Sequence, residues 1–373
     1  MNARHRFIAL SLLVSAPLAI SSWAQAASFE TLITTPLAIE GLTNDNQGNL
    51  YTPARGGSPS CPVYRVNIAN PSLVVVGNIP APCSPSGLAF NRAGRLFVSQ
   101  GSDIVSFVPN SSSPPAATVF ASGVPGTNGL AFDRAGNLWT GDGTTGLGRV
   151  WKVSPAGLVT EMFRVQPMVN VVPAFTVGAT TFTGVGRDVR TVPTGNSQPL
   201  VANGLAFDRE GNLFIADTAR GAIWKVSFEP SGQLRSQTGC DTTFTPNTLC
   251  LENIFVQHSL LDGADGIALD EAGNIWVSAN ERNAMVVVSN EGREVTEVFR
   301  NPPDPTSKLR NGGPLETPTS PALSDLRLCT ANSDGGRRDN SPPSGGELPA
   351  LGLGKISCMT ERLQVRGMPL PVR

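Results

Sequence analysis

Charged residues are scarce in this chain. They make up 15% of its 373 residues, and 28 basic residues nearly balance 29 acidic ones, which gives a formal net charge of -1. A protein that captures nucleic acid through its phosphates normally needs a strongly basic face. The composition therefore predicts a protein without a nucleic-acid partner.

Histidine is scarcer still. Beyond residue 26 the sequence has a single histidine, His258, which excludes a site built from two or more histidines. A Ser/His/Asp triad would have to use His258, and no Gly-x-Ser-x-Gly elbow is present. Cysteines never occur as Cys-x-x-Cys, which argues against a zinc cluster. Glycine and proline are frequent, at 39 and 31 residues, and this composition is typical of a turn-rich fold rather than a helical bundle.

The first 26 residues have the layout of a secretory signal peptide. A basic start (residues 4–6) precedes an apolar run (7–20) and a small-x-small cleavage site (24–26). The alternative is a membrane anchor, but the run is shorter than the roughly 20 residues that a spanning helix needs. No later segment is apolar enough to span a membrane. We therefore expect a secreted or periplasmic protein, with one domain over residues 27–373.

All six cysteines lie beyond the predicted cleavage site. An even number of cysteines in an exported chain predicts disulfides, although some could be reduced and buried. Their clustering in the sequence favours three short-loop pairs, which are Cys61–Cys83, Cys240–Cys250 and Cys329–Cys358.

A repeat runs through the chain. Five segments superpose without gaps, and each has a second glycine seven residues after the first, followed by an aliphatic and an aromatic residue. They are GLTNDNQGNLYTP from Gly41, GLAFNRAGRLFVS from Gly87, GLAFDRAGNLWTG from Gly129, GLAFDREGNLFIA from Gly204 and GIALDEAGNIWVS from Gly266.

One repeat predicts two strands joined by a polar turn, and the apolar stretches after it supply a third and a fourth strand. Four antiparallel strands make a propeller blade. We predict an all-β, six-bladed β-propeller with a degenerate sixth unit from about residue 318, closed by residues 29–37; five or seven blades are the alternatives. The wider repeat spacings of 75 and 62 residues imply insertions. The segment 165–200 is interpreted either as a lid or as an enlarged outer hairpin.

The residue before the first repeat glycine is polar in all five units. If the ring closes, these residues converge on one end of the central channel. Carboxylate and amide oxygens suit a divalent cation, with Ca2+ the first choice and Mg2+, Mn2+ or Zn2+ possible. The alternative is that the residues satisfy backbone groups in turns. The five are Glu40, Ser86, Asn128, Asn203 and Asp265.

The ends of the second strands carry a further polar set. Asp142 and Asp217 occupy the same repeat position, and Gln100 and Asn280 are grouped with them. We expect a structural role for this set.

The repeats resemble the SMP-30/gluconolactonase/luciferin-regenerating family. The resemblance rests on ANGLAFDREGNLFIADTARGAIWKV, DGADGIALDEAGNIWVSA, IEGLTNDNQGNLYTP and the ending GKISCMTERLQVRGMPLPV. It implies a six-bladed propeller whose channel metal is held by Glu40, Asn203 and Asp265. It also implies that Asn128 contacts substrate and that Asp265 is the general base. Where sugar-lactone members often have Arg-Pro-Asn-Asp, this chain has Gly126-Thr127-Asn128-Gly129, which argues against a sugar lactone.

The function expected on these grounds is metal-dependent hydrolysis of a cyclic ester, that is, a lactonase acting on a small molecule. The alternatives are a non-enzymatic binding module, with a structural metal or none, and a lyase or strictosidine-synthase-like propeller.

Overall fold

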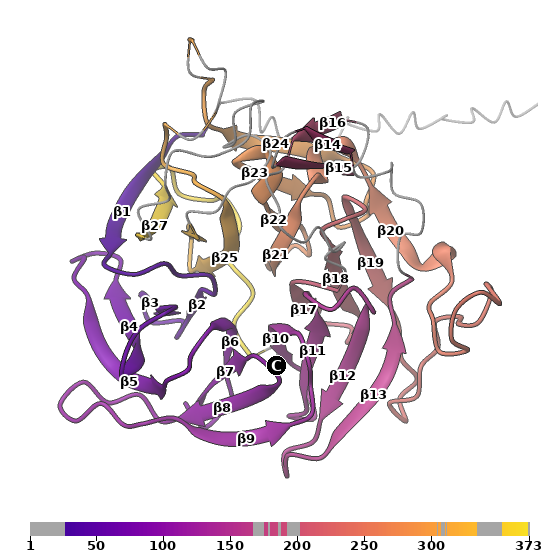
Figure 1. Ribbon diagram of the computed structural model, residues 1–373, viewed down its shortest axis with the longest axis horizontal. Coiled ribbons are helices and arrows are strands. Elements are labelled where there is room, and N and C mark those ends of the chain that lie inside the picture. The colour runs from indigo at the N-terminus through magenta and orange to yellow at the C-terminus, as the bar shows by residue number, and fades with distance from the viewer. Residues whose placement is uncertain are drawn as a thin grey trace, which may run out of the picture.

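The fold is a ring of six blades around a central channel (Figure 1). The structure, a computed structural model, describes residues 27–166, residues 202–333 apart from 304, 307–309 and 311, and residues 353–371, together with the backbone of three strands between 175 and 191. Each blade is a four-stranded antiparallel sheet, which confirms the predicted six-bladed propeller. The predicted signal peptide lies outside the described residues.

The first three blades follow one another along the chain. Blade 1 consists of β2 (Thr43–Asn44), β3 (Asn49–Pro53), β4 (Ser60–Asn67) and β5 (Val74–Pro80). Blade 2 consists of β6 (Pro85–Phe90), β7 (Leu96–Gln100), β8 (Asp103–Phe107) and β9 (Thr118–Ser122). Blade 3 consists of β10 (Thr127–Phe132), β11 (Leu138–Asp142), β12 (Arg149–Val153) and β13 (Val159–Arg164).

The last three blades contain the insertions and the ring closure. Blade 4 consists of β17 (Leu205–Phe207), β18 (Leu213–Asp217), β19 (Ala222–Val226) and β20 (Ile254–Gln257). Blade 5 consists of β21 (Ala264–Leu269), β22 (Ile275–Ala279), β23 (Ala284–Val288) and β24 (Val295–Arg300). Blade 6 consists of β25 (Pro318–Ser324), β26 (Arg327–Asn332), β27 (Gly354–Met359) and β1 (Phe29–Thr35).

The chain closes the ring by completing blade 6 from both ends. Strand β1 pairs antiparallel with β27, from Phe29 opposite Met359 to Thr35 opposite Gly354. This is the closure predicted for residues 29–37. A disulfide between Cys329 and Cys358 joins the neighbouring strands β26 and β27. The other two predicted pairs are present as well, so all three predicted disulfides are confirmed.

The two long repeat spacings have different origins. Between blades 3 and 4, the described backbone forms a three-stranded antiparallel sheet of β14 (Phe175–Val177), β15 (Thr180–Val185) and β16 (Asp188–Thr191). The rest of this segment lies outside the described residues, and so does the feature predicted as a lid or an outer hairpin. The second insertion joins β19 to β20 and contains the Cys240–Cys250 disulfide and the 3-10 turn η1 (Leu251–Asn253).

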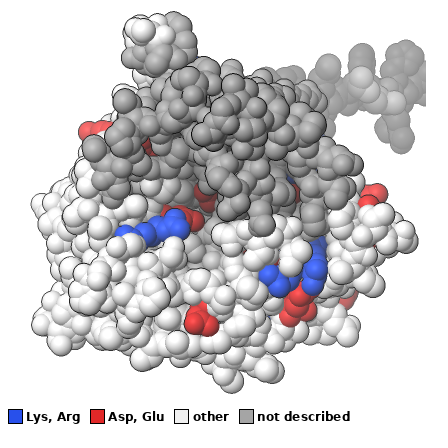
Figure 2. Space-filling model, in the orientation of Figure 1, with Lys and Arg blue, Asp and Glu red and all other residues white. Residues whose placement is uncertain are grey.

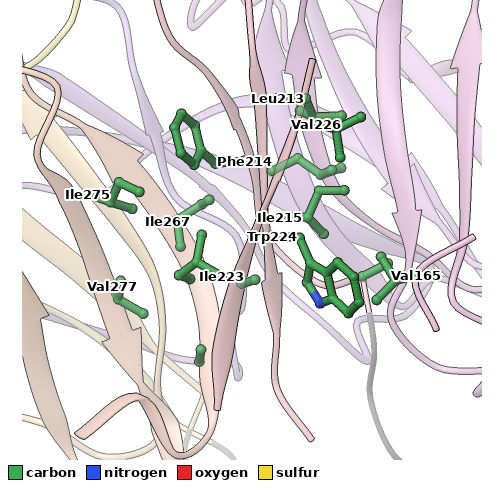
Figure 3. Packing of buried hydrophobic residues seen from close by; sticks show 14 of the residues in the cluster. Val165, Leu213, Phe214, Ile215, Ile223, Trp224, Val226, Ile267, Ile275 and Val277 are labelled. Atoms are coloured by element: carbon green, nitrogen blue, oxygen red, sulfur yellow. The ribbon is translucent and has the colours of Figure 1, made fainter. Parts of the chain in front are cut away.

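Apolar side chains from adjacent blades form the core. Figure 3 shows Ile223 of blade 4 facing Ile267 of blade 5, with Trp224 on the other side against Val165. Ile223 and Trp224 are fully buried. Because successive side chains of a strand point to opposite faces, one strand packs against both neighbouring blades. This explains why the strands of the repeat are almost continuously apolar.

An acid of the repeat holds the turn between the first two strands. In blade 5, Asp270 accepts hydrogen bonds from the backbone N–H of Asn274 at 2.9 Å, from Asn274 Nδ2 at 2.9 Å and from Trp276 Nε1 at 3.1 Å. Asp133 makes the same three bonds in blade 3. The turn then passes through the second repeat glycine, whose φ is +83° at Gly273, a conformation that disfavours side chains.

The channel is apolar at one end, and the C-terminal segment closes that end. All six inner strands line a cavity of about 100 Å3 there, together with Met368, Leu370 and Pro371. The backbone N–H of Met368 donates to Leu269 O at 2.9 Å, and that of Leu370 donates to Asn46 Oδ1 at 3.1 Å. The segment therefore crosses from blade 5 to blade 1.

Helical structure is confined to short turns in the described residues. Besides η1, these are η2 (Ser259–Leu261) and η3 (Asn280–Arg282). None of the described helices has the length or the hydropathy to cross a membrane.

The two tyrosines provide a test of this packing. Burial and the neighbouring Asp45, whose carboxylate accepts a hydrogen bond from the Tyr51 hydroxyl at 3.2 Å, raise the pKa of Tyr51 to about 12. Burial also raises the pKa of Tyr64. Because the chain has only these two tyrosines, an ultraviolet titration of the folded protein should show little phenolate near pH 10. The same titration in guanidinium chloride should give a pKa of about 10.

These raised pKa values also fix the sign of the effect on stability. A raised folded-state pKa means that the neutral phenols favour folding. Their contribution is complete below about pH 10 and is lost as the pH rises toward the folded-state pKa of about 12 for Tyr51. Phenolate formation near pH 10 with the native circular dichroism retained would contradict the buried environment described here.

Candidate functional site

The inner strands of neighbouring blades meet at the repeat glycines. A Cβ added at Gly87 would lie 2.3 Å from Asn128 O, one at Gly129 would lie 2.6 Å from Asn203 O, and one at Gly204 would lie 2.5 Å from Asp265 O. Real Cβ atoms do not approach this closely, so each glycine is required by the contact with the next blade. The backbone carbonyl of the residue before each of these glycines therefore packs against the repeat glycine of the preceding blade.

These contacts continue around the whole ring. Gly41 faces Ser86 O in the same way, and Gly266 faces Thr319 O. Thr319 Oγ1 in turn donates to Glu40 O at 2.5 Å, which closes the circle. The structure therefore brings all five predicted residues into one ring and adds a sixth, Thr319. The ring residues are Glu40, Ser86, Asn128, Asn203, Asp265 and Thr319.

Thr319 was missed by sequence reasoning. In blade 6 the repeat glycine is replaced by Ser320, followed by Pro321, so the repeat signature is lost. The remaining signal is the pair Ala322-Leu323, which corresponds to Ala-Phe in the units of blades 2 to 4 and to Ala-Leu in that of blade 5.

The two hydroxyl members of the ring are used in its wall. Ser86 Oγ donates to Thr127 O at 3.2 Å, and Thr319 Oγ1 donates to the Glu40 carbonyl. Both side chains are buried. We conclude that the hydroxyls hold adjacent blades together, which leaves the two carboxylates and two amides as candidates for chemistry.

Glu40 is paired with Arg55. The guanidinium Nη1 contacts Glu40 Oε2, and Nη2 donates to Ser84 Oγ at 3.1 Å. The Arg55 side chain is 36% exposed and that of Glu40 is 16% exposed. The sequence alone does not pair Arg55 with Glu40, because the two lie fifteen residues apart on different segments.

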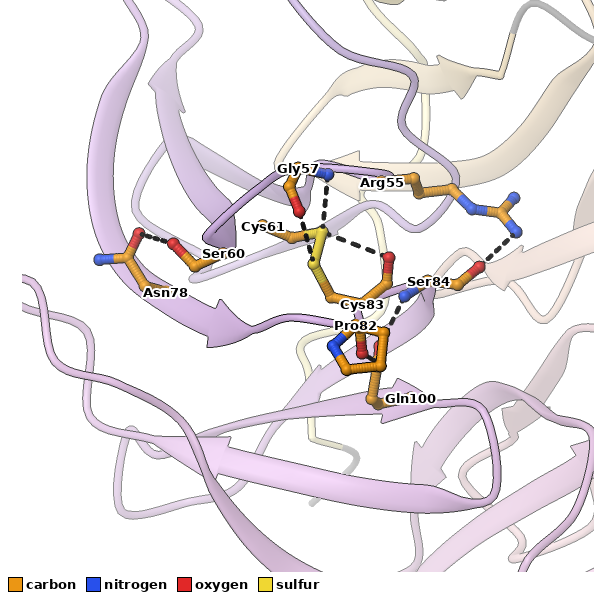
Figure 4. The surroundings of a disulfide bond; sticks show 9 residues. All are labelled: Arg55, Gly57, Ser60, Cys61, Asn78, Pro82, Cys83, Ser84 and Gln100. Atoms are coloured by element: carbon orange, nitrogen blue, oxygen red, sulfur yellow. Dashed lines mark hydrogen bonds between the residues drawn. A yellow bond between two sulfur atoms is a disulfide. The ribbon is translucent and has the colours of Figure 1, made fainter.

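A disulfide fixes the loop that carries Arg55. Figure 4 shows the Cys61–Cys83 bond beside this loop. The backbone N–H of Gly56 donates to Cys83 O at 3.3 Å, and that of Gly57 donates to Cys61 Sγ at 3.3 Å. The disulfide therefore helps to place the positive charge next to Glu40.

Asn203 and Asp265 are deeply buried and hydrogen-bonded by their own blades. Asn203, 2% exposed, donates from Nδ2 to Thr218 Oγ1 at 3.0 Å. Asp265, 6% exposed, accepts at Oδ2 from Asn280 Nδ2 at 2.8 Å. Neither Thr218 nor the pairing of Asn280 with Asp265 was predicted from the sequence.

The second-strand ends divide into two kinds of residue. Asp142 and Asp217 are fully buried and form ion pairs with Arg149 and Arg220, each at 3.1 Å. This is the structural role expected for them, and burial raises the pKa of Asp217 while Arg220 opposes the rise. Asn280 lies one residue beyond this register, because β22 ends at Ala279; grouping it with the two acids was wrong.

The remaining predicted candidates lie in structural contacts. His258 caps η2, since its Nδ1 accepts the backbone N–H of Leu260 at 3.1 Å. Gln100 bonds the loop before β6, with its Nε2 donating to Pro82 O at 2.9 Å (Figure 4).

The donor set of the ring suits a divalent cation. It consists of oxygen ligands, which hard cations prefer. Because Asn203 uses Nδ2 on Thr218, its Oδ1 is left as an acceptor, and Arg55 contacts only one of the two Glu40 oxygens. On the part of the molecule that grey atoms do not cover, Figure 2 shows few charged side chains, and some basic and acidic groups lie next to one another.

Comparison with known proteins agrees with the repeat. Residues 185–314 match the sequence model of the SMP-30/Gluconolactonase/LRE-like region. The chain carries an SMP-30/gluconolactonase/LRE-like region. The matched stretch includes Asn203 and Asp265, and the resemblance predicted from the repeats is confirmed. Comparison of the sequence with curated proteins gives no match.

Solved structures resemble this chain in fold. A luciferin-regenerating enzyme is 15% identical with a TM-score of 0.60, covering 93% of this chain and 99% of that chain. Regucalcin from Agrobacterium tumefaciens, a calcium-binding protein, is 17% identical with a TM-score of 0.60, covering 93% and 97%. A putative gluconolactonase is 14% identical with a TM-score of 0.52, covering 92% and 94%. At these identities the likeness concerns the fold alone.

The structural role of the second-strand acids can be tested by comparing a buried and an exposed ion pair. Asp217→Asn should lower the free energy of unfolding by about 3 kcal/mol, because it leaves the largely buried Arg220 charge unpaired. Glu271→Gln breaks the exposed pair with Arg209 and should cost less than about 1 kcal/mol. Chemical denaturation of the two variants measures the difference. Equal stabilities would show that the Asp217 pair does not hold blade 4.

Proposed function

We propose that the protein is an exported, divalent-metal-dependent hydrolase that opens a cyclic ester. The observation that carries this proposal is the ring of two carboxylates and two amides around one end of the channel, closed by contacts between all six blades. The family match and the fold shared with a calcium-binding regucalcin support it. The three disulfides support export.

Glu40, Asn203 and Asp265 are the residues that would hold the cation. Each lies at the same position of its own blade, so the ligands approach from different sides of the channel. Ca2+ is our first choice, because all of the ligands are oxygens. When bound, such a cation polarises a carbonyl and lowers the pKa of a bound water to favour its ionisation.

The chain's own residues supply orientation and proton transfer. Asp265 is proposed as the general base that accepts a proton from the attacking water, and its carboxylate is held by Asn280 Nδ2. Asn128, 7% exposed, is proposed to donate from its amide to the substrate. Its own backbone carbonyl is fixed by Ser99 Oγ at 2.6 Å, so the side chain projects from a rigid strand.

The residues beside Asn128 indicate the substrate class. Gly126 and Gly129 offer no side chains to a ligand, and the Thr127 hydroxyl is engaged by those of Ser99 and Thr140. Residues 126–129 therefore offer no charged group of their own to the many hydroxyls of a sugar. We propose a lactone that is less hydroxylated than a sugar lactone.

One observation favours a second candidate function, a binding module that does without a cation. Arg55 already neutralises Glu40, so the ring does not depend on a metal for charge compensation at this position. In that case the ring would be structural.

Metal content and activity separate these two functions. Purified mature protein should contain nearly one divalent ion per chain and should hydrolyse members of a lactone panel, with activity lost on chelation and restored by Ca2+. Saturation at 100 times Kd should stabilise the fold by about 2.7 kcal/mol.

Glu40→Gln should reduce that stabilisation, and Asp265→Asn should lower kcat at least about 100-fold. Glu271→Gln, on an exposed side chain, is the control. Protein that neither contains metal nor hydrolyses any lactone would favour the binding module.

A further inference from the structure

A single repeat position controls the ring side chains in blades 3, 4 and 5. It is the residue directly after the second strand, namely Gly143, Thr218 and Asn280. Each contacts the ring residue of its own blade: Gly143 faces Asn128, Thr218 bonds Asn203, and Asn280 bonds Asp265. The residue type differs in each blade, and so does the effect on the ring.

Thr218 fixes which atom of Asn203 is available. Its hydroxyl donates to Ala264 O at 2.7 Å. A hydroxyl has one proton to donate, so Thr218 must accept from Asn203 Nδ2, 3.0 Å away. The amide of Asn203 is therefore held with its carbonyl oxygen directed elsewhere. Both side chains are buried, and water cannot easily replace this relay.

Asn280 fixes the carboxylate of Asp265 in a comparable way. Asn280 is fully buried, and its Nδ2 donates to Asp265 Oδ2 at 2.8 Å. Its Oδ1 is among the buried side-chain atoms that have no hydrogen-bond partner in the described part of the chain. A flipped amide would turn Oδ1 toward the carboxylate and repel it. The structure thus tolerates an unsatisfied carbonyl oxygen, which is costly, and keeps the N–H on Asp265.

Gly143 has the opposite effect. A Cβ at this position would lie 2.6 Å from Asn128 Nδ2, so the glycine makes room for the amide without bonding it. Within the described residues, the Asn128 amide has no side-chain hydrogen bond. It is therefore the ring amide that can still adjust to a ligand.

We propose that Thr218 and Asn280 are positioning residues that present the Asn203 carbonyl oxygen and the Asp265 carboxylate to a divalent cation. Gly143 leaves Asn128 free to adapt to the substrate. This inference rests on the proposed function, since it assigns residues that act through the cation ligands. It follows from the direction of the hydrogen bonds and from the glycine in blade 3.

Calcium titration of conservative variants tests the proposal. Thr218→Val removes the hydroxyl with little change in volume and should weaken Ca2+ binding about 10- to 100-fold. Thr218→Ser keeps the hydroxyl and should bind within a few-fold of the wild type. Thr330→Val is the matched control, because Thr330 is a fully buried hydroxyl that bonds Ser278 at 3.0 Å and makes no bond to a ring side chain; its Ca2+ affinity should equal that of the wild type. Isothermal titration calorimetry with CaCl2 measures each affinity.

Thermal unfolding without metal separates positioning from folding. Thr218→Val and Thr330→Val should lose similar stability, while Thr218→Val alone loses affinity. If Thr218→Val does not fold, Asn280→Ala serves as the second variant, with the same expected loss of affinity. Wild-type affinity in the folded Thr218→Val or Asn280→Ala protein would overturn the positioning role and leave the proposed function standing. A wild type that binds no Ca2+, Mg2+, Mn2+ or Zn2+ would overturn both.

Discussion

The close approach of backbones at the repeat glycines is the constraint on which the rest of this structure depends. At Gly87, Gly129 and Gly204 the next blade's carbonyl oxygen lies 2.3 to 2.6 Å from where a Cβ would be. A side chain there would push the blades apart and widen the channel. The same contact sets the distance between neighbouring ring residues, because each ring residue directly precedes its blade's glycine. The contacts at the repeat glycines therefore determine both the packing of the blades and the geometry of the site.

A ring made in this way has six equivalent positions but need not have six equivalent functions. Ser86 and Thr319 can donate to a nearby backbone carbonyl, and they do. Carboxylates have no proton to donate at neutral pH, and an amide has two polar atoms to place. Glu40, Asn203 and Asp265 therefore need partners of their own, which Arg55, Thr218 and Asn280 provide. The type of residue at each ring position therefore decides whether its side chain bonds the backbone of the ring or stays available to a ligand in the channel.

The sequence predicted the blade count and five ring residues because both follow from a repeat whose register can be counted. It could not predict Thr319, since Ser320 takes the place of the marker glycine. Nor could it predict that Thr218 and Asn280 support the ring. They follow strands of equal length in two blades, but their types differ, and only the direction of each hydrogen bond reveals a common role. The Arg55–Glu40 pair depends on a loop whose path is fixed by the Cys61–Cys83 disulfide.

The Arg55–Glu40 pair also bears on how the proposed site could exist in two forms. Placing a carboxylate in a largely buried position is costly unless a positive charge is near. Arg55 provides that charge from a loop, and its side chain is 36% exposed, whereas Glu40 is 16% exposed. The guanidinium contacts one carboxylate oxygen, so a cation at the other oxygen need not displace it. Arg55 would then stabilise the ring before the cation binds, while the like charges of Arg55 and the cation would limit affinity. Arg55 would thus raise the stability of the metal-free ring and lower its affinity for a cation.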